Sequence, residues 1–328
     1  MLGCDKVKDA LVMGGTEFVS KAIAKYLISL GYTVDIFTRG RREVDYEGIR
    51  EHLQGDRHSV EELQRELGDR SYNYIFDITA YTKEDVAKLV KVVKRDDLKR
   101  YLFCSSGAVY LPNKGVSSED FPRGRNPHWG SYGLDKALAE DYLFDLYHQE
   151  GFPITIFRPT YIYGEGNNLY REAYFFDRIR EGLAIPIPAG EQEVQFVYIG
   201  DLVKSFVSGA ISEDALGKAY NLTNDRTITW KKLLTTAMEV VGKEVELVEV
   251  DKATRKEFNL VSKNFFPFRN ITFLLSITRL KEDNLYIPKT TLKQGLSRAY
   301  QWYLKDNNND FNHSMDKIDF ILTKHKTI

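Results

Sequence analysis

Residues 8–38, KDALVMGGTEFVSKAIAKYLISLGYTVDIFT, decide the fold. A short apolar run enters a glycine turn, as a buried strand does, and apolar residues at helical spacing then predict a helix over 18–30. Gly31 ends that helix, and residues 34–38 supply a second strand. Strand, turn, helix and strand form a βαβ unit, whose two strands are expected to be parallel with a right-handed crossover.

The same alternation continues through the first half of the chain. Strands are predicted at 74–78, 100–104 and 153–157, and helices at 59–67, 82–93 and 132–147. Strands that alternate with helices are typical of a doubly wound, parallel α/β sheet of the Rossmann type. We therefore expect an α/β fold with a dinucleotide-binding domain over residues 1–160.

The regular alternation of strands and helices ends after Pro159. It predicts helices over 170–180, 230–241 and 291–304, a strand over 194–199, and a helix from Asp201, with a proline-rich stretch at 185–188. We expect residues 161–310 to form mainly a smaller substrate-binding lobe, with a segment of about 190–225 returning to the first domain. An Asn-rich break at 305–310 precedes a C-terminal extension, 311–328.

Composition excludes several classes of protein. The chain has 328 residues, 43% of them hydrophobic, which excludes a disordered or fibrous protein. Its 46 Lys and Arg nearly balance 47 Asp and Glu, so no bulk positive field would attract nucleic acid or anionic lipid. The longest apolar stretches, such as 271–277, are too short to cross a bilayer.

The remaining signals indicate a cytoplasmic protein without a metal. Cys4 and Cys104 are too few for a disulfide framework, which fits a reducing compartment, and the N-terminus resembles no secretion signal. The six histidines show no metal-ligand spacing. We expect a cytoplasmic location and no metal site.

The glycine turn is the first candidate site. In a βαβ unit this turn brings helix amides against the diphosphate of a dinucleotide. Here Gly14 keeps the first position of the common GxxGxxG pattern, whereas Glu17 and Ser20 occupy the other two. Glu17 would repel a diphosphate unless it points to solvent, so a tight turn without a ligand is an open alternative.

The end of the second strand bears on cofactor choice. A carboxylate there binds a ribose diol, whereas a guanidinium pairs with a 2′-phosphate. The chain has Arg39, Arg41 and Arg42, which favours NADP over NAD, although a solvated basic loop has the same composition. Asp56, in the Gly-Asp pair after a possible third strand, would lie near the adenine.

Tyr132 and Lys136 are the candidate catalytic pair. Four residues apart, they lie on one face of a helix, and a nearby ammonium would lower the pKa of the phenol and make it a general acid or base. Ser106 follows a strand and so lies at the carboxyl edge of the sheet, where it would hold the reacting oxygen. Alone, Ser106 is also a plausible turn residue, and Tyr132 a packed surface aromatic.

These motifs together resemble the NAD-dependent epimerase/dehydratase family, the extended short-chain dehydrogenases/reductases. The matching segments span nearly the whole chain and include FCSSGAVY at 103–110, RPTYIYG at 158–164 and QFVYIGD at 195–201. Within the family, the sequence is similar to a branch that includes chloroplast stem-loop RNA-binding proteins and bacterial sugar-epimerase-like proteins.

The resemblance implies a sugar or nucleotide-sugar epimerase or reductase that moves a hydride at a carbinol carbon, with NADP, or alternatively NAD, and a homodimeric state. It implies that Ser106, Tyr132 and Lys136 are catalytic. The cofactor would be surrounded by Gly14, Thr16, Phe18, Val19, Arg39, Asp56, Arg57, Thr79, Ala80, Lys136 and Pro159. The substrate would contact Ser106, Tyr161, Asn168 and Arg178.

At two places the sequence differs from the family pattern, and each difference bears on the reaction or the substrate. Gly107 and Ala108 stand where dehydratases carry acidic residues, which disfavours dehydration. Val194 stands where UDP-sugar epimerases commonly carry an arginine, and Arg178, Arg269 and Arg279 are the candidates to replace it. The alternatives are a catalytically silent nucleotide- or RNA-binding protein and a regulator that senses the NADP redox state.

Overall fold

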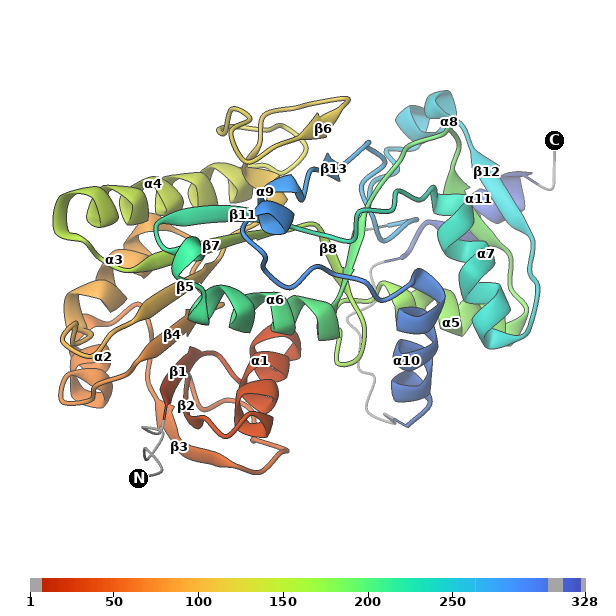
Figure 1. Cartoon of the computed structure of the whole chain (residues 1–328). Coiled ribbons are helices and arrows are strands. Elements are labelled where there is room, and N and C mark those ends of the chain that lie inside the picture. Colours follow the sequence, from red (N-terminus) through yellow and green to blue (C-terminus); the bar gives the residue numbers. More distant parts are fainter. Residues whose placement is uncertain (1–7, 263, 306–314, 326–328) are drawn as a thin grey trace.

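The computed structural model describes residues 8–262, 264–305 and 315–325. Cys4, most of the expected break at 305–310 and the start of the 311–328 extension lie outside these ranges. Within them, a seven-stranded parallel sheet has the order β11-β7-β5-β4-β1-β2-β3 (Figure 1). The predicted doubly wound α/β fold is confirmed.

The sheet strands have the following bounds: β1 Asp9–Met13, β2 Thr33–Thr38, β3 Ile49–Gln54, β4 Tyr74–Asp77, β5 Arg100–Cys104, β7 Ile154–Pro159 and β11 Lys218–Leu222. Helices α2 (Val60–Leu67), α3 (Lys83–Val92) and α4 (Tyr132–Glu150) pack together on one face, and α1 (Phe18–Ser29) packs with α6 (Ile199–Ile211) on the other (Figure 1). The predicted helices and strands of the first half are therefore confirmed to within a few residues.

The alternation of side chains along a strand explains the two faces. Ala10 and Val12 of β1 belong to the core under α1 and α6, whereas Leu11 and Met13 belong to the core under α2, α3 and α4. All four side chains are completely buried. Each fully buried Leu, Val or Met contributes about 1.5–3 kcal/mol, so this continuous apolar strand is favoured in the centre of the sheet.

The second half of the chain forms a lobe at the carboxyl edge of the sheet (Figure 1). Its helices are α5 Glu172–Glu181, α7 Trp230–Val241, α8 Lys252–Glu257, α10 Leu292–Lys305 and α11 Ile318–His325. Its strands pair as β8 Tyr161–Tyr163 with β10 Phe196–Tyr198 and β9 Ile185–Pro188 with β12 Leu247–Val250. Beside the main sheet, α9 (Thr278–Glu282) packs on β11, and β13 (Leu274–Leu275) pairs with β6 (Val116–Ser117), which lies between β5 and α4 in the chain.

The strand predicted over 194–199 is shorter than expected. β10 covers only Phe196–Tyr198, and α6 begins at Ile199 rather than at Asp201. Val194 pairs instead with Ile228, with which it exchanges two backbone hydrogen bonds of 2.9 Å. α6 and β11 then return to the main sheet, so residues 199–222 pack with the first half of the chain.

Candidate active site

A cavity of about 1170 Å³ lies at the carboxyl edge of the sheet, where loops that follow β1, β2, β4, β5 and β7 meet the lobe. Open α/β sheets bind ligands at this edge, beside the strand at which the chain order reverses. Here the order reverses between β1 and β4. Most of the predicted site residues line the cavity: Gly14, Thr16, Phe18, Val19, Arg39, Asp56, Arg57, Thr79, Ser106, Tyr132, Lys136, Pro159, Tyr161 and Asn168.

The glycine turn has the conformation that a dinucleotide turn requires. Gly14 and Gly15 have φ values of +105° and +125°, and a Cβ atom on Gly14 would lie 2.6 Å from Ser20 Oγ. Only glycine tolerates both constraints. Ser20 therefore fits in place of the last glycine because Gly14 leaves room for it.

The Glu17 carboxylate does not bind the backbone amides at the N-terminus of α1. Its side chain forms no capping bond at the start of α1, and its carboxylate lies 3.1 Å from Arg42 and accepts a 3.2 Å hydrogen bond from Asn168. The two partners hold the carboxylate between the basic loop and the lobe. The turn therefore fits a diphosphate on the amides at the N-terminus of α1.

Arg39 and Arg41 line the cavity after β2, and both are exposed. Within the described parts of the chain, neither guanidinium has a side-chain or backbone partner. Arg42 is the member of the basic loop that pairs with Glu17. Two cations without partners at this strand end favour a ligand that carries a negative charge there.

Arg57 reaches the cavity wall, but its guanidinium is bound within the fold. It donates to both carboxylate oxygens of Asp77, at 2.8 and 3.0 Å, and to Thr79 Oγ1 at 2.8 Å. Asp56, beside it, accepts a hydrogen bond from the backbone of His58. Arg57 therefore supports the cavity wall through Asp77 and Thr79, and Asp56 lines the same cavity.

Ser106, Tyr132 and Lys136 come together at the bottom of the cavity. Tyr132 is the first residue of α4, and Lys136 lies one turn later, with its Nζ 6.0 Å from the centroid of the Tyr132 ring. Burial raises the pKa of Tyr132 to about 12, while a hydrogen bond with Ser106 acts to lower it. The three side chains therefore meet at one point of the carboxyl edge.

The expected acidification of the phenol by Lys136 is not what the structure shows. Lys136 Nζ donates hydrogen bonds of 2.6 Å to the carbonyl oxygens of Ala80 and Cys104, and burial lowers the pKa of the amine. The ammonium is oriented by these carbonyls, and burial dominates the pKa of Tyr132. Ala80, which does not line the cavity, contributes through this carbonyl.

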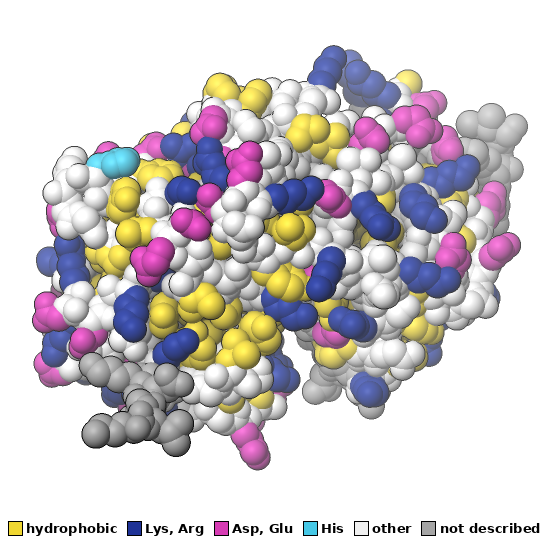
Figure 2. Space-filling model, viewed as in Figure 1, with side chains coloured by type: hydrophobic (Ala, Val, Ile, Leu, Met, Phe, Trp, Pro, Cys, Tyr) yellow, Lys and Arg dark blue, Asp and Glu magenta, His cyan; other side chains and the backbone are white. Residues whose placement is uncertain are grey.

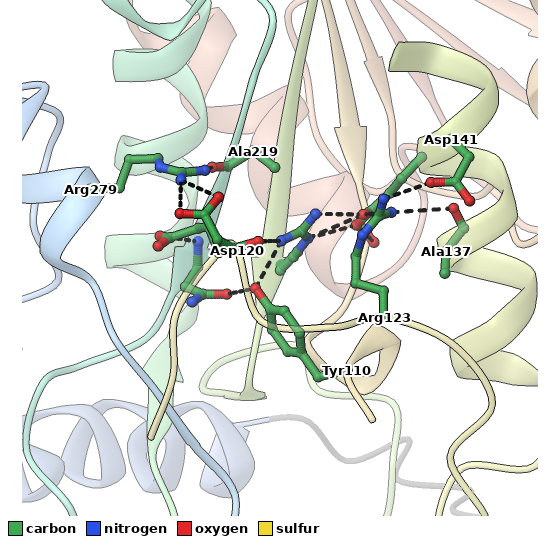
Figure 3. Close-up of polar contacts among 12 residues, drawn as sticks. Tyr110, Asp120, Arg123, Ala137, Asp141, Ala219 and Arg279 are labelled. Carbon is green, nitrogen blue, oxygen red and sulfur yellow. Dashed lines mark hydrogen bonds and ion pairs between the residues drawn. The ribbon is translucent and has the colours of Figure 1, made fainter. Parts of the chain in front are cut away.

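Two of the proposed substitutes for the missing substrate arginine lie elsewhere. Arg178 lines a separate cavity between α5 and α11 and donates to the carbonyl of Ala184. Arg279 donates from one guanidinium nitrogen, Nη2, to both carboxylate oxygens of Asp120, at 2.8 Å each (Figure 3). Arg269 does line the main cavity, together with Arg171, which the sequence analysis missed because no motif marks it.

A buried polar network fixes α4 against the sheet. Glu140, two turns after Tyr132 on the same face of α4, accepts hydrogen bonds from Arg158 at 2.7–3.2 Å and from Ser105 at 2.5 Å. Arg123 joins Glu140 to Asp141, and Tyr110 connects Arg158 to Asn221 of β11 (Figure 3). The network positions the helix that carries Tyr132 and Lys136.

No helix in the described ranges is long and apolar enough to span a membrane. Among the same residues, no group of three or more His, Cys, Asp or Glu side chains is arranged to hold a metal ion.

Curated relatives include a stem-loop binding protein and several sugar enzymes. The chain is 28% identical over 310 residues to the chloroplast stem-loop binding protein of 41 kDa b from Arabidopsis thaliana, covering 89% of this chain and 78% of that protein. It is 25% identical over 234 residues to an N-acetyl-alpha-D-glucosaminyl-diphospho-ditrans,octacis-undecaprenol 4-epimerase from Escherichia coli, covering 65% and 68%.

Solved structures of similar fold include sugar epimerases and a dehydratase. One is a UDP-glucose 4-epimerase of Thermotoga maritima with UDP-glucose, at a TM-score of 0.75 and 20% identity, covering 90% of this chain and 99% of that one. Another is a UDP-N-acetylglucosamine 4-epimerase of Methanobrevibacter ruminantium, at 0.75 and 19%, covering 92% and 99%. The model of the NAD dependent epimerase/dehydratase family matches residues 10–223, more than half of the chain, and with the site geometry this shows that the chain belongs to that family of extended short-chain dehydrogenase/reductase enzymes.

Proposed function

We propose that this protein is an NADP-preferring epimerase or reductase that acts on the hydroxyl of a sugar or nucleotide-sugar. The observation that carries the proposal is the meeting of Ser106, Tyr132 and Lys136 in the same cavity as the Gly14 turn. When bound, the oxidised nicotinamide supplies a hydride acceptor and a positive charge beside the phenol.

In this mechanism Tyr132 takes the proton of the substrate hydroxyl as the hydride leaves the same carbon. Ser106 donates a hydrogen bond to the substrate oxygen and steadies the negative charge that develops on it. Lys136, held by the carbonyls of Ala80 and Cys104, would hold the ribose hydroxyls of a bound cofactor. If a bound nicotinamide returned the hydride to the opposite face of the ketone, with Tyr132 giving the proton back, the outcome would be epimerisation, and release of the ketone would be net oxidation.

Isotope exchange tests this function. Sugars and nucleotide-sugars labelled with deuterium at each carbinol carbon are incubated with protein and NADP, and the label is followed by mass spectrometry. Transfer of deuterium to the cofactor, or inversion at the labelled carbon, is the expected result. Binding of NADPH with no exchange from any labelled compound would contradict the proposal.

The basic strand end predicts a specific cofactor preference. Arg39→Ala should weaken NADPH binding by about 10- to 100-fold, since one charge-assisted hydrogen bond is worth about 1.5–3 kcal/mol, and should leave NADH binding unchanged. Fluorescence titration of each reduced cofactor measures both constants. Arg65→Ala, on the exposed side of α2 and paired with Glu66, is the matched control and should change neither. An equal loss for both cofactors would contradict the NADP assignment.

Binding to structured RNA is the second candidate because the Arabidopsis relative is called a stem-loop binding protein. RNA affinity depends on phosphate neutralisation, but the net charge of this chain is −1, and basic and acidic side chains are interspersed on the face in Figure 2. We expect no gel shift of a stem-loop RNA at about 150 mM salt. A shift that weakens steeply with added salt would favour the RNA-binding function instead.

The homodimer and the cytoplasmic location expected from the sequence stay predictions.

A further inference from the structure

Two arginine side chains on the lobe side of the cavity have no carboxylate partner. Arg171 lies over the rings of Tyr161 and Phe268, at 5.6 and 5.2 Å from their centroids. Arg269 lies 4.4 Å from the centroid of Trp129 and donates a hydrogen bond to the carbonyl of His128. Across the described residues, neither guanidinium has an Asp or Glu oxygen within 4.0 Å.

These cations are partly buried and repel each other. Burial lowers the pKa of Arg171, and the charge of Arg269 lowers it further. Two desolvated cations without a counter-charge are unfavourable, so such an arrangement is expected where an anionic ligand supplies the compensation. The aromatic rings beneath them hold both guanidinium planes in place.

A third polar group, the Tyr161 hydroxyl, lines the cavity with the two cations. The Tyr161 hydroxyl is buried in the wall of the same cavity and forms no hydrogen bond of normal geometry with the described residues. Arg171 lies 5.6 Å from the centroid of the Tyr161 ring, and Arg269 lies over Trp129, whose ring is 6.2 Å from that of Tyr161. Burial raises the pKa of Tyr161 to about 12, whereas Arg171, Arg269 and the backbone N–H of Arg269 act to lower it. A neutral phenol and two guanidinium groups form a donor set suited to an oxyanion.

The anion subsite lies on the reactive side of the cavity. The charge of Arg171 also acts on Tyr132, so the subsite and the proposed general base are in electrostatic reach of each other. An anionic group carried by the reacting sugar would therefore lie within reach of this subsite.

Closely packed aromatic side chains fill the part of the lobe behind this subsite. Phe268 stacks on Trp230 at 5.3 Å and meets Phe196 edge to face at 5.2 Å, and all three side chains are buried. Val194, at the place of the family's substrate arginine, is completely buried and hydrogen-bonded through its backbone to Ile228. A nucleotide extending in this direction would have to displace the aromatic cluster.

We infer that the substrate is a compact sugar or polyol bearing its own phosphate or carboxylate group, bound by Arg171, Arg269 and Tyr161, rather than a nucleotide-sugar. This inference rests on the proposed function and narrows its substrate class. Phosphate esters and carboxylates both present oxyanions to such donors. Binding experiments with one sugar of each kind therefore distinguish the two groups.

The test measures binding without requiring turnover. Calorimetric titrations of glucose 6-phosphate, glucuronate, glucose and UDP-glucose are carried out on the full chain, with and without NADPH. At least one of the two anionic sugars should bind about tenfold or more tightly than glucose and more tightly than UDP-glucose. If glucose 6-phosphate binds more tightly, the subsite prefers a phosphate group; if glucuronate does, it prefers a carboxylate.

A matched pair of variants assigns the subsite. Arg171→Gln should weaken binding of the anionic sugar about tenfold, whereas Arg226→Gln, at an exposed position outside the cavity, should not. Tighter binding of UDP-glucose, equal binding of glucose and the anionic sugars, or equal effects of the two variants would overturn the inference. NADPH binding is scored separately, so failure of the anion subsite with intact cofactor binding leaves the proposed function standing, whereas loss of cofactor binding counts against that function.

Discussion

Replacing Tyr132 with phenylalanine should lower the rate of hydride transfer by about 10²–10⁴-fold, the usual contribution of a positioned general acid or base. The substitution removes one hydroxyl from a partly buried side chain at the first residue of α4 and leaves the ring beside that of Tyr81, whose centroid is 6.1 Å away. NADPH affinity should therefore change little. Single-turnover absorbance of the cofactor, with the substrate identified by isotope exchange, measures the rate.

The pH dependence of the same reaction has a definite sign. Burial raises the pKa of Tyr132 to about 12, so only a small fraction of the phenol is ionised at neutral pH. If Tyr132 acts as the base, the oxidation rate rises with pH, by up to tenfold per pH unit while the pKa stays above the measured range. A positive charge from the bound cofactor shifts the profile to lower pH without reversing it.

The control is a second tyrosine on the same helix. Tyr142→Phe removes a hydroxyl from α4 outside the cavity and should leave both the rate and its pH profile unchanged. A Tyr132→Phe variant that retains the wild-type rate, or that loses its rate while keeping the wild-type pH profile, would show that another group accepts the proton.

The first half of the fold was predictable because its signals are local. The buried strand at β1, the glycine turn and the amphipathic α1 each follow from residues close together in sequence, and Gly14 indeed has a positive φ. The position of Ser106 and Tyr132 in one cavity was also predictable, because the carboxyl ends of parallel strands meet at one edge of a sheet.

Other features depend on contacts between distant residues. The proline-rich stretch 185–188 can form β9 because the prolines, which lack an N–H group, alternate with residues that donate: Ile185 donates to Glu246, just before β12, and Ala189 donates to Val250. Nothing near Lys136 in sequence indicates that its ammonium is bound by Ala80 and Cys104. Likewise, the role proposed for Arg171 cannot be recognised from the sequence, because it depends on Tyr161 and Arg269, which are brought near Arg171 only by the fold.

Glu140→Gln should destabilise the protein by about 3–5 kcal/mol, because removing one charge leaves the buried Arg158 without compensation. Glu140 is completely buried and also accepts from Ser105 and Arg123, so the amide breaks or weakens several charge-assisted bonds. Urea unfolding measures the free energy. Glu150→Gln, which breaks only the exposed pair between Arg95 and the end of α4, should cost less than about 1 kcal/mol.

Acid dependence gives this prediction a second readout. Burial alone would raise the pKa of Glu140, but Arg158 outweighs it and holds the pKa below the usual 4.5. A carboxylate whose pKa is lower in the folded state contributes stability above its unfolded pKa and loses it as pH falls through the folded value. The difference in unfolding free energy between wild type and Glu140→Gln should therefore shrink below about pH 4.5. A difference that is constant with pH, or no larger than that of Glu150→Gln, would mean that the ion pair with Arg158 does not hold α4 in place.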